Sequence, residues 1–300
     1  MKKKVLIIGK GSSGLRFKQK LKKKYEILNL SSKKFNKNSL KNRIFDLIII
    51  SSPSSFHIKH LIICKNYSDN FLIDKPLTDK LSKLKHIKNF EKKRIFVNYN
   101  LREINLIKKY KIFINKITNK GKLQFCNVYC GSNVTYWRKK NYKNSVSLSR
   151  KLGGGAILEL SHELDLIYKF FGEPSKVISI KKKLSKKTNN VEDIFISQMY
   201  FKKINLLLTL NLNFLDNNNK RYFELNYANY NFKLDLINHK LLIINKNKKK
   251  IIKFINNLND TYFIIPDKIL NKNYSKLCSL DESKKISKFI LKIKNNSINF

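Results

Sequence analysis

The sequence predicts an α/β protein with two domains: an N-terminal domain built on a parallel sheet and a C-terminal α/β domain with an open, mainly antiparallel sheet. In the first part of the chain, short apolar runs alternate with helical patterns, as in parallel strands joined by crossover helices. Beyond about Thr118, strand patterns follow one another across short Asn- and Lys-rich turns, as in antiparallel sheets. We therefore expect domains at residues 1–118 and 119–300.

The elements of the first domain are predicted from their apolar residues. Residues 5–8 and 45–50 are continuous apolar runs, typical of strands that are covered on both faces. Shorter runs predict the other strands, and apolar residues at helical spacing predict the helices between them. The expected strands are 5–8, 25–30, 45–50, 71–74 and 95–98, and the expected helices are 13–24, 55–65 and 81–92.

The second domain is predicted to consist mainly of strands. A helical pattern over residues 154–171 interrupts them, and a last helix covers residues 281–294. The expected strands are 121–129, 175–182, 194–202, 205–214, 221–228, 231–236 and 240–244.

The net charge of +44 points to two explanations. Such an excess is typical of proteins that bind nucleic acid or another polyanion. However, only seven of the 64 basic residues are Arg, whose bidentate geometry nucleic-acid sites favour. The lysines are spread along the whole chain together with many Asn and Ile residues, and all three have AT-rich codons. We therefore favour compositional bias over a nucleic-acid partner, with a dedicated polyanion site as the alternative.

Neither a membrane segment nor a metal site is expected. No apolar run approaches the roughly 20 residues needed to cross a bilayer, and the N-terminal run Val5–Ile8 leads directly into glycines rather than a cleavage site. We therefore expect a cytoplasmic protein. The cysteines form no CxxC pair, so buried free thiols are expected and no metal ligands. They are Cys64, Cys126, Cys130 and Cys278.

Three glycines follow the first predicted strand in the pattern GxGxxG, and a helix is expected directly after them. In that context the first glycine makes a tight turn, the second lets a pyrophosphate approach the backbone, and the third allows close packing of helix and strand. The helix N-terminus adds free N–H groups for the phosphates. The motif predicts a dinucleotide-binding Rossmann domain with Gly9, Gly11, Ser12, Ser13 and Gly14 at the cofactor.

The end of the second strand bears on the choice between NAD and NADP. An acidic residue there would hold the adenosine ribose, but the sequence continues as Ser31-Ser32-Lys33. Hydroxyl groups followed by a cation accommodate a 2′-phosphate, so Ser31 and Ser32 are expected at the cofactor with a preference for NADP. The alternative, that Lys33 is one more solvated lysine, stays open.

Four further segments resemble the Gfo/Idh/MocA oxidoreductases, the family of glucose–fructose oxidoreductase and inositol dehydrogenase. They occur in the family's order and extend the resemblance over nearly the whole chain. The loop around Trp137 and Tyr142, with the glycine triplet, further resembles a branch associated with surface-sugar biosynthesis. The segments are 51–57 (SSPSSFH), 74–77 (DKPL, where the family has Glu-Lys-Pro), 99–102 (YNLR) and 153–165 (GGGAILELSHELD).

The resemblance implies roles for individual residues. Ser51, Pro53, His57 and Asp74 would lie beside the cofactor, and Lys75 would touch both the cofactor and the reacting hydroxyl. It also implies that helix 281–294 packs back on the first domain and that the protein forms a homodimer or homotetramer.

His162 is the second candidate for proton transfer. On one helix, Glu159, His162 and Asp165 recur three residues apart and share roughly one face, so a carboxylate can orient the imidazole. The family more often has Asp in place of Glu159. The alternative is that His162 is structural, as a single helical histidine usually is.

The remaining candidates are substrate residues, among them Asp165. Aromatic rings pack on sugar C–H groups, and Arg binds carboxylate or phosphate groups. This favours Arg102, Trp137, Arg138 and Tyr142, with plain core packing as the alternative for the aromatic residues. Together the sequence predicts hydride transfer between NAD(P) and a hydroxyl-bearing carbon of a sugar, sugar derivative or cyclitol. A non-catalytic dinucleotide-binding regulator on the same scaffold is the alternative.

Overall fold

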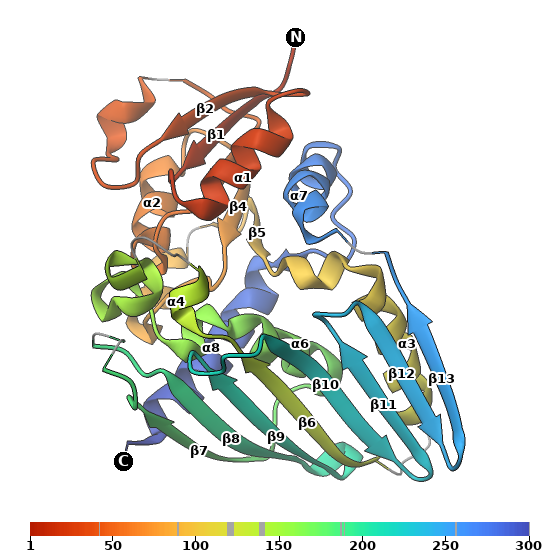
Figure 1. Ribbon diagram of the computed structural model, residues 1–300. Coiled ribbons are helices and arrows are strands. Elements are labelled where there is room, and N and C mark those ends of the chain that lie inside the picture. The colour runs from red at the N-terminus through yellow and green to blue at the C-terminus, as the bar shows by residue number, and fades with distance from the viewer. Residues whose placement is uncertain are drawn as a thin grey trace. The chain divides into compact units, whose positions relative to one another are not determined.

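The computed structural model describes residues 1–41, 43–88, 90–118, 123–137, 142–186, 188, 190–255 and 257–299. The chain divides into two compact units (Figure 1). The first unit comprises Met1–Glu103 and Asn257–Leu291, and the second comprises Ile104–Asn256 and Lys292–Phe300. Each unit contains one sheet.

The first unit contains a six-stranded sheet in the order β14-β5-β4-β3-β1-β2, in which all neighbours are parallel except the pair β14–β5. This confirms the predicted Rossmann architecture. Its apolar strand residues are almost all buried, as expected for strands covered on both faces. The strands are β1 (Lys4–Ile8), β2 (Glu26–Leu30), β3 (Leu47–Ile50), β4 (Asn70–Asp74), β5 (Arg94–Asn98) and β14 (Cys278–Ser279).

Helices from both ends of the chain cover this sheet. Helix α1 (Ser12–Leu21) and helix α7 (Thr261–Leu270) bury Phe17, Tyr262 and Ile265 in one core with the strands. Helix α2 (His57–Cys64) packs against β3 and β4. The helix predicted over 81–92 is wrong in type and length, because a 3-10 helix at Leu81–Ile87 replaces it.

The strand order reverses between β1 and β3, because β1 pairs with β2 on one side and with β3 on the other. In open parallel sheets, ligands bind at the carboxyl ends of the strands where the order reverses. The segments that follow these two strands begin at Gly9 and Ser51. The topology therefore places the predicted cofactor loop at the expected binding position.

The second unit contains a nine-stranded sheet in the order β13-β12-β11-β10-β6-β9-β8-β7-β15. Its neighbours are antiparallel except for the parallel pairs β6–β9 and β7–β15, which confirms the prediction of a mainly antiparallel sheet. The strands are β6 (Leu123–Gly131), β7 (Lys176–Lys182), β8 (Ile194–Phe201), β9 (Leu206–Asn213), β10 (Lys220–Tyr227), β11 (Tyr230–Asp235), β12 (Lys240–Asn245), β13 (Lys248–Lys253) and β15 (Ile298–Asn299).

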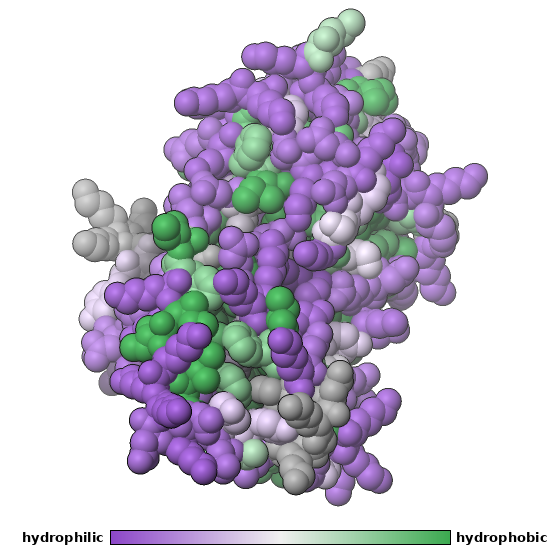
Figure 2. All heavy atoms as spheres, turned by 90° about the vertical axis from the view of Figure 1, so that its right-hand side faces the viewer, coloured by the Kyte–Doolittle hydropathy of each residue, from purple (hydrophilic) through white to green (hydrophobic). Residues whose placement is uncertain are grey.

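Helices α3 (Asn105–Thr118) and α6 (Ser161–Phe171) cover one face of this sheet. Tyr110 of α3, Phe170 of α6 and Phe223 of β10 meet edge to face, with ring centroids 5.7–6.5 Å apart. The predicted helix 154–171 is two helices, because Leu160 breaks it between α5 (Ala156–Glu159) and α6. Hydrophilic side chains dominate the surface that Figure 2 shows, as the net charge requires.

Helix α8 (Leu280–Asn296) lies mostly in the first unit, and its last residues belong to the second. Among the described residues, none of the helices is long and apolar enough to span a bilayer. Nor do the described residues contain a group of three or more His, Cys, Asp or Glu side chains that could hold a metal ion. The four cysteines are buried free thiols, as predicted.

Candidate functional site

The glycine loop of the first unit packs so closely that two of its glycines have no substitute. Gly9 has φ +132°, and a Cβ there would lie 2.4 Å from the carbonyl oxygen of Ser51. A Cβ on Gly14 would lie 2.1 Å from the carbonyl oxygen of Gly9. The first glycine therefore makes the turn and the third lets α1 pack against β1 and β3, as the motif requires.

Gly11 differs from its neighbours because it faces open space. Its backbone is extended, with φ −78° and ψ −174°, and a Cβ there would meet no atom within 4 Å. Gly11 is also the N-cap residue of α1, no side chain caps the helix, and its first turn contains no acidic residue. The open space beside an uncapped helix N-terminus fits a pyrophosphate, which needs close backbone approach and N–H donors.

Asn29 is a residue of this site that the sequence reasoning missed. Its side-chain amide donates hydrogen bonds to the carbonyl oxygens of Ile7, at 3.1 Å, and Gly9, at 2.9 Å. The amide N–H of Gly9 in turn donates to the carbonyl of Leu30. These bonds fix the start of the glycine loop to β2. The signal available in the sequence was an amide residue close to the end of the second strand.

The segment after β2 has the composition expected for a phosphate site. Ser31 and Lys33 are exposed and Ser32 is partly exposed. No acidic residue occurs between Leu30 and Asp46. The segment therefore lacks the carboxylate that would repel a 2′-phosphate.

His57 holds two loops at the carboxyl ends of β3 and β4. Its side chain is buried, with Nε2 2.8 Å from the carbonyl oxygen of Ser52 and Nδ1 2.9 Å from that of Pro76. Burial lowers the pKa of His57, although the nearby Asp74 acts in the opposite direction. In either neutral tautomer the ring donates to one of these carbonyls. The structure thus gives His57 a loop-holding contact rather than a free ring nitrogen for a cofactor.

His60 extends this arrangement, since its Nδ1 lies 2.9 Å from Ser52 Oγ and its ring stacks on Phe56. Pro53, in the loop after β3, precedes a 3-10 turn at Ser54–Phe56. The Ser51 hydroxyl donates to the Ile8 carbonyl, and Ser51 packs closely against Gly9 and Gly14. The predicted cofactor residues from the loops after β1 and β3 are therefore brought together.

Lys75 lies at the carboxyl end of β4, as predicted, and is partly exposed. Asp74 Oδ1 accepts hydrogen bonds from Asn98 Nδ2 and from the backbone N–H of Lys75, each at 3.2 Å. Because these bonds hold the carboxylate, the peptide that carries Lys75 is anchored to β5. The Lys75 side chain starts from a fixed position at the edge of the sheet where the glycine loop also lies.

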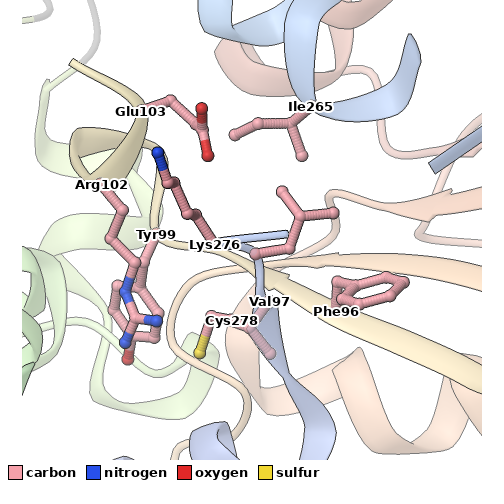
Figure 3. Close-up of a pocket in the computed structure, with 9 residues that line it drawn as sticks. Phe96, Val97, Tyr99, Arg102, Glu103, Ile265, Lys276 and Cys278 are labelled. Atoms are coloured by element: carbon pink, nitrogen blue, oxygen red, sulfur yellow. The ribbon is translucent and has the colours of Figure 1, made fainter. Parts of the chain in front are cut away.

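Arg102, predicted at the substrate, is 3% exposed, and its Nη1 donates to Glu282 Oε2 at 2.7 Å. Figure 3 shows its guanidinium against the ring of Tyr99, at 5.8 Å from the ring centre. The pocket in that view, lined also by Val97, has room for about one water molecule (about 10 Å³). The positive charge of Arg102 is already paired with Glu282 inside the first unit, so Arg102 is a poor candidate for binding a substrate anion.

In the second unit, a glycine triplet precedes the two helices that carry the other candidates. Gly155 has φ +108°, and a Cβ there would lie 2.2 Å from Glu192 Oε1. Glu159, at the end of α5, accepts a hydrogen bond from Ser147 Oγ at 2.9 Å. The expectation that Glu159 and His162 belong to one helix is wrong, because Leu160, with φ −96° and ψ +30°, separates α5 from α6. His162 and Asp165 do share α6, where His162 is partly exposed and Asp165 is fully buried.

The aromatic candidates lie around α4 (Val134–Trp137). Trp137 is 36% exposed, its Nε1 donates to Ser132 Oγ at 2.7 Å, and its ring meets Phe214 edge to face. Tyr142 is partly exposed in a 3-10 turn. Arg138 lies outside the described residues. The indole is thus held by Ser132 and Phe214 and remains partly exposed, which is compatible with stacking on a sugar.

No protein-family model matches the chain, and no curated protein matches its sequence. Solved structures, however, share its fold over almost its whole length. An oxidoreductase from Thermotoga maritima is 15% identical with a TM-score of 0.79, covering 97% of this chain and 95% of its own. The myo-inositol 2-dehydrogenase of Lactobacillus plantarum is 15% identical with a TM-score of 0.75, covering 98% and 97%.

The WlbA dehydrogenase of Bordetella pertussis, solved in complex with NADH and UDP-GlcNAcA, is 14% identical with a TM-score of 0.76, covering 99% of this chain and 97% of its own. At these identities the likeness concerns the fold. The chain has the two-domain fold of the Gfo/Idh/MocA-type oxidoreductases, in agreement with the resemblance of its sequence motifs.

Proposed function

We propose that the protein is an NAD(P)-dependent oxidoreductase that transfers hydride between nicotinamide and a hydroxyl-bearing carbon of a sugar, sugar derivative or cyclitol. The observation that carries the proposal is the open space at Gly11, between two glycines that are sterically irreplaceable. A structural turn would have no need of a glycine with φ −78° and no neighbouring atom. A backbone that a ligand approaches closely would need a glycine at this position.

The first unit would hold the dinucleotide with its own loops. The N–H groups at Gly11, Ser12, Ser13 and Gly14 would bind the pyrophosphate, and the exposed Ser31 and Ser32 would take the adenosine ribose. The absence of an acidic residue from that segment supports a preference for NADP. When bound, the nicotinamide ring gives or accepts the hydride. Ser51, Pro53 and Asp74 would lie near that ring, with His57 fixing their loops.

Lys75 would handle the hydroxyl proton of the substrate. Its ammonium group can donate a proton to a carbonyl oxygen in one direction and, as the neutral amine, remove the hydroxyl proton in the other. The bonds that hold Asp74 support this role, because they fix the backbone from which the lysine extends. A general acid or base must reach its proton within hydrogen-bond distance, so positional order matters.

The second unit would supply the substrate residues and a second proton-transfer group, His162. Its spacing from Asp165 on α6 supports an imidazole oriented by a carboxylate. Trp137 and Tyr142 would pack on the sugar, and Arg138 is proposed from its sequence position alone. The WlbA dehydrogenase of the same fold, with its bound UDP-GlcNAcA, supports a sugar substrate, and we propose a role in surface-polysaccharide biosynthesis.

We also propose that the protein is a cytoplasmic homodimer or homotetramer, assembled through the sheet face of the second unit that the helices leave uncovered. Register pairs on that face include the exposed Phe125 and Leu207, and Ile178 is 66% exposed. Sedimentation velocity at two concentrations tests this, and a single monomeric species would contradict it.

Titration of the protein with NADPH and NADH, followed by nicotinamide fluorescence, tests the main proposal. We expect saturable binding of at least one, with NADPH preferred. Turnover is then followed at the nicotinamide absorbance band with a panel of sugars, cyclitols and nucleotide sugars. Tight cofactor binding without turnover on any of them would favour the regulator instead. Failure to bind either cofactor would remove both functions.

A further inference from the structure

A buried ion pair in the second unit holds an arginine by only one of its nitrogens. Glu163, in the first turn of α6, is fully buried, and its Oε1 accepts a hydrogen bond from Arg221 Nε at 2.5 Å. Arg221 stands on β10 on the same face as the buried Phe223, which is the face that α3 and α6 cover. Its side chain nevertheless keeps 19% of its surface exposed.

The ion pair between Arg221 and Glu163 leaves hydrogen-bonding groups of both side chains unused. Within the described residues, the guanidinium makes no hydrogen bond other than the one to Glu163, so its two Nη groups donate none. Glu163 Oε2 is likewise buried without a hydrogen-bond partner among the described residues. An arginine that served only to neutralise a buried carboxylate would be expected to pair bidentately. Here the pair has a single hydrogen bond, on a side chain that keeps part of its surface exposed.

The same contact stabilises the charged form of the Arg221 guanidinium. Glu163 raises the pKa of Arg221 further above its ordinary value, against the opposing effect of burial. Glu163 therefore acts as a positioning residue that sets the orientation of the guanidinium. Two parallel N–H donors on a fixed, charged plane match the oxygens of a carboxylate or phosphate group.

We propose that Arg221 binds an oxyanion of the substrate, so that the substrate is an anionic sugar. This rests on the proposed function and specifies its substrate class. Glu163 directly follows His162 in α6, which places Arg221 against the same helical turn that carries the candidate proton-transfer group. An oxyanion on Arg221 would therefore fix a sugar beside that turn. The carboxylate of a uronic acid and the phosphate of a sugar phosphate share the chemistry that Arg221 recognises.

Calorimetric titration of the full-length protein with three probes tests the proposal. D-Glucuronate and D-glucose 6-phosphate carry the two oxyanions, and D-glucose carries none. The ionic strength is held at about 0.15 M, so that the general positive charge is screened beyond about 8 Å. We expect one of the anionic sugars to bind at least about tenfold more tightly than D-glucose, and the one that does identifies the oxyanion.

Arg221→Lys keeps the charge beside Glu163 but removes the fork, and we expect it to lose the preference by about tenfold or more. Lys220→Gln is the matched control, because it removes one charge from the preceding residue, which is half exposed and points away from α6. It should keep the preference. Arg221→Gln would leave Glu163 uncompensated and endanger folding, so the charge-free comparison is the double variant Glu163→Gln/Arg221→Gln.

Three results would overturn the inference: equal binding of all three sugars, binding of neither anionic sugar, or an unchanged preference in Arg221→Lys. If the double variant fails to fold, Arg221→Lys alone decides. The cofactor titration separates this inference from the proposed function. Normal NADPH binding without an oxyanion preference removes only the role of Arg221, whereas an oxyanion preference without NADPH binding removes only the oxidoreductase.

Discussion

Replacing Gly11 with alanine separates the folding of the glycine loop from its function. Alanine adopts φ −78° and ψ −174° without strain, and its methyl group would meet no protein atom within 4 Å. The free energy of unfolding should therefore stay constant or rise by about 0.4–1 kcal/mol, because alanine reduces the freedom of the unfolded chain. A pyrophosphate seated on that backbone would instead meet the methyl group. Overpacking of this kind costs about 1–3 kcal/mol, which raises the Kd for NADPH about 5- to 150-fold.

The assay pairs thermal unfolding with NADPH fluorescence titration of the same preparations. Gly14→Ala is the matched control, since its Cβ would lie 2.1 Å from a backbone oxygen, and it should lower the unfolding temperature as well as the affinity. The reasoning fails if Gly11→Ala binds NADPH like the wild type. It also fails if Gly11→Ala is destabilised, because the loop would then need that glycine for its own packing.

Four further predictions have defined outcomes. Lys75→Ala should reduce turnover at least about a hundredfold with nearly unchanged cofactor affinity, as separate kinetic and fluorescence measurements would show. Ser31→Asp should weaken NADPH binding relative to NADH by about tenfold, through repulsion of the 2′-phosphate. Burial lowers the pKa of His60 from 6.5 to about 4, so between these pH values the unfolded chain binds a proton that the folded chain does not. The free energy of unfolding therefore falls as the pH drops through this range. Urea unfolding at pH 7 and pH 5 should show a smaller loss of stability in His60→Gln than in the wild type. Asp165→Asn should change the pH profile of turnover, whereas Glu159→Gln should leave its shape unchanged.

The strands were predictable because burial leaves a simple pattern: a continuous apolar run where both faces of a strand are covered, and alternation where one face is covered. Predicted strand ends agree with the described ones to within two residues. Helix α3 was missed although its buried Leu106, Ile107, Tyr110 and Ile114 recur at helical spacing, whereas two other missed elements lack a simple pattern. The edge strand β13 reads Lys-Lys-Lys-Ile-Ile-Lys, because an edge strand needs no apolar face and lysines protect it from pairing with another chain. Helix α7 contains Pro266 and is mostly apolar, so its helical form depends on tertiary packing against α1, β3 and β4.

The site was predictable where chemistry is local in the sequence. The roles proposed for the glycines and Lys75 depend on their immediate backbone neighbours, and these residues lie at the loop after β1 and the end of β4, where the motifs predict them. Asn29 and Arg221 act through residues 20 and 58 positions away. No periodicity in a single sequence links a strand amide to the carbonyl of Gly9, or a strand arginine to a helix carboxylate. Such contacts depend on strand register, which becomes known only with the fold.

The break at Leu160 shows how one misread element changes a mechanistic argument. The spacing of Glu159 and His162 orients an imidazole only if both residues belong to one helix, and they do not. Ser147 holds Glu159, and Arg221 holds Glu163, the acid next to His162 in the chain. Of the three acidic residues in the segment, Asp165 alone keeps the three-residue spacing within α6. On this spacing we propose the fully buried Asp165 as the carboxylate that orients His162, and the pH profile of Asp165→Asn tests the assignment.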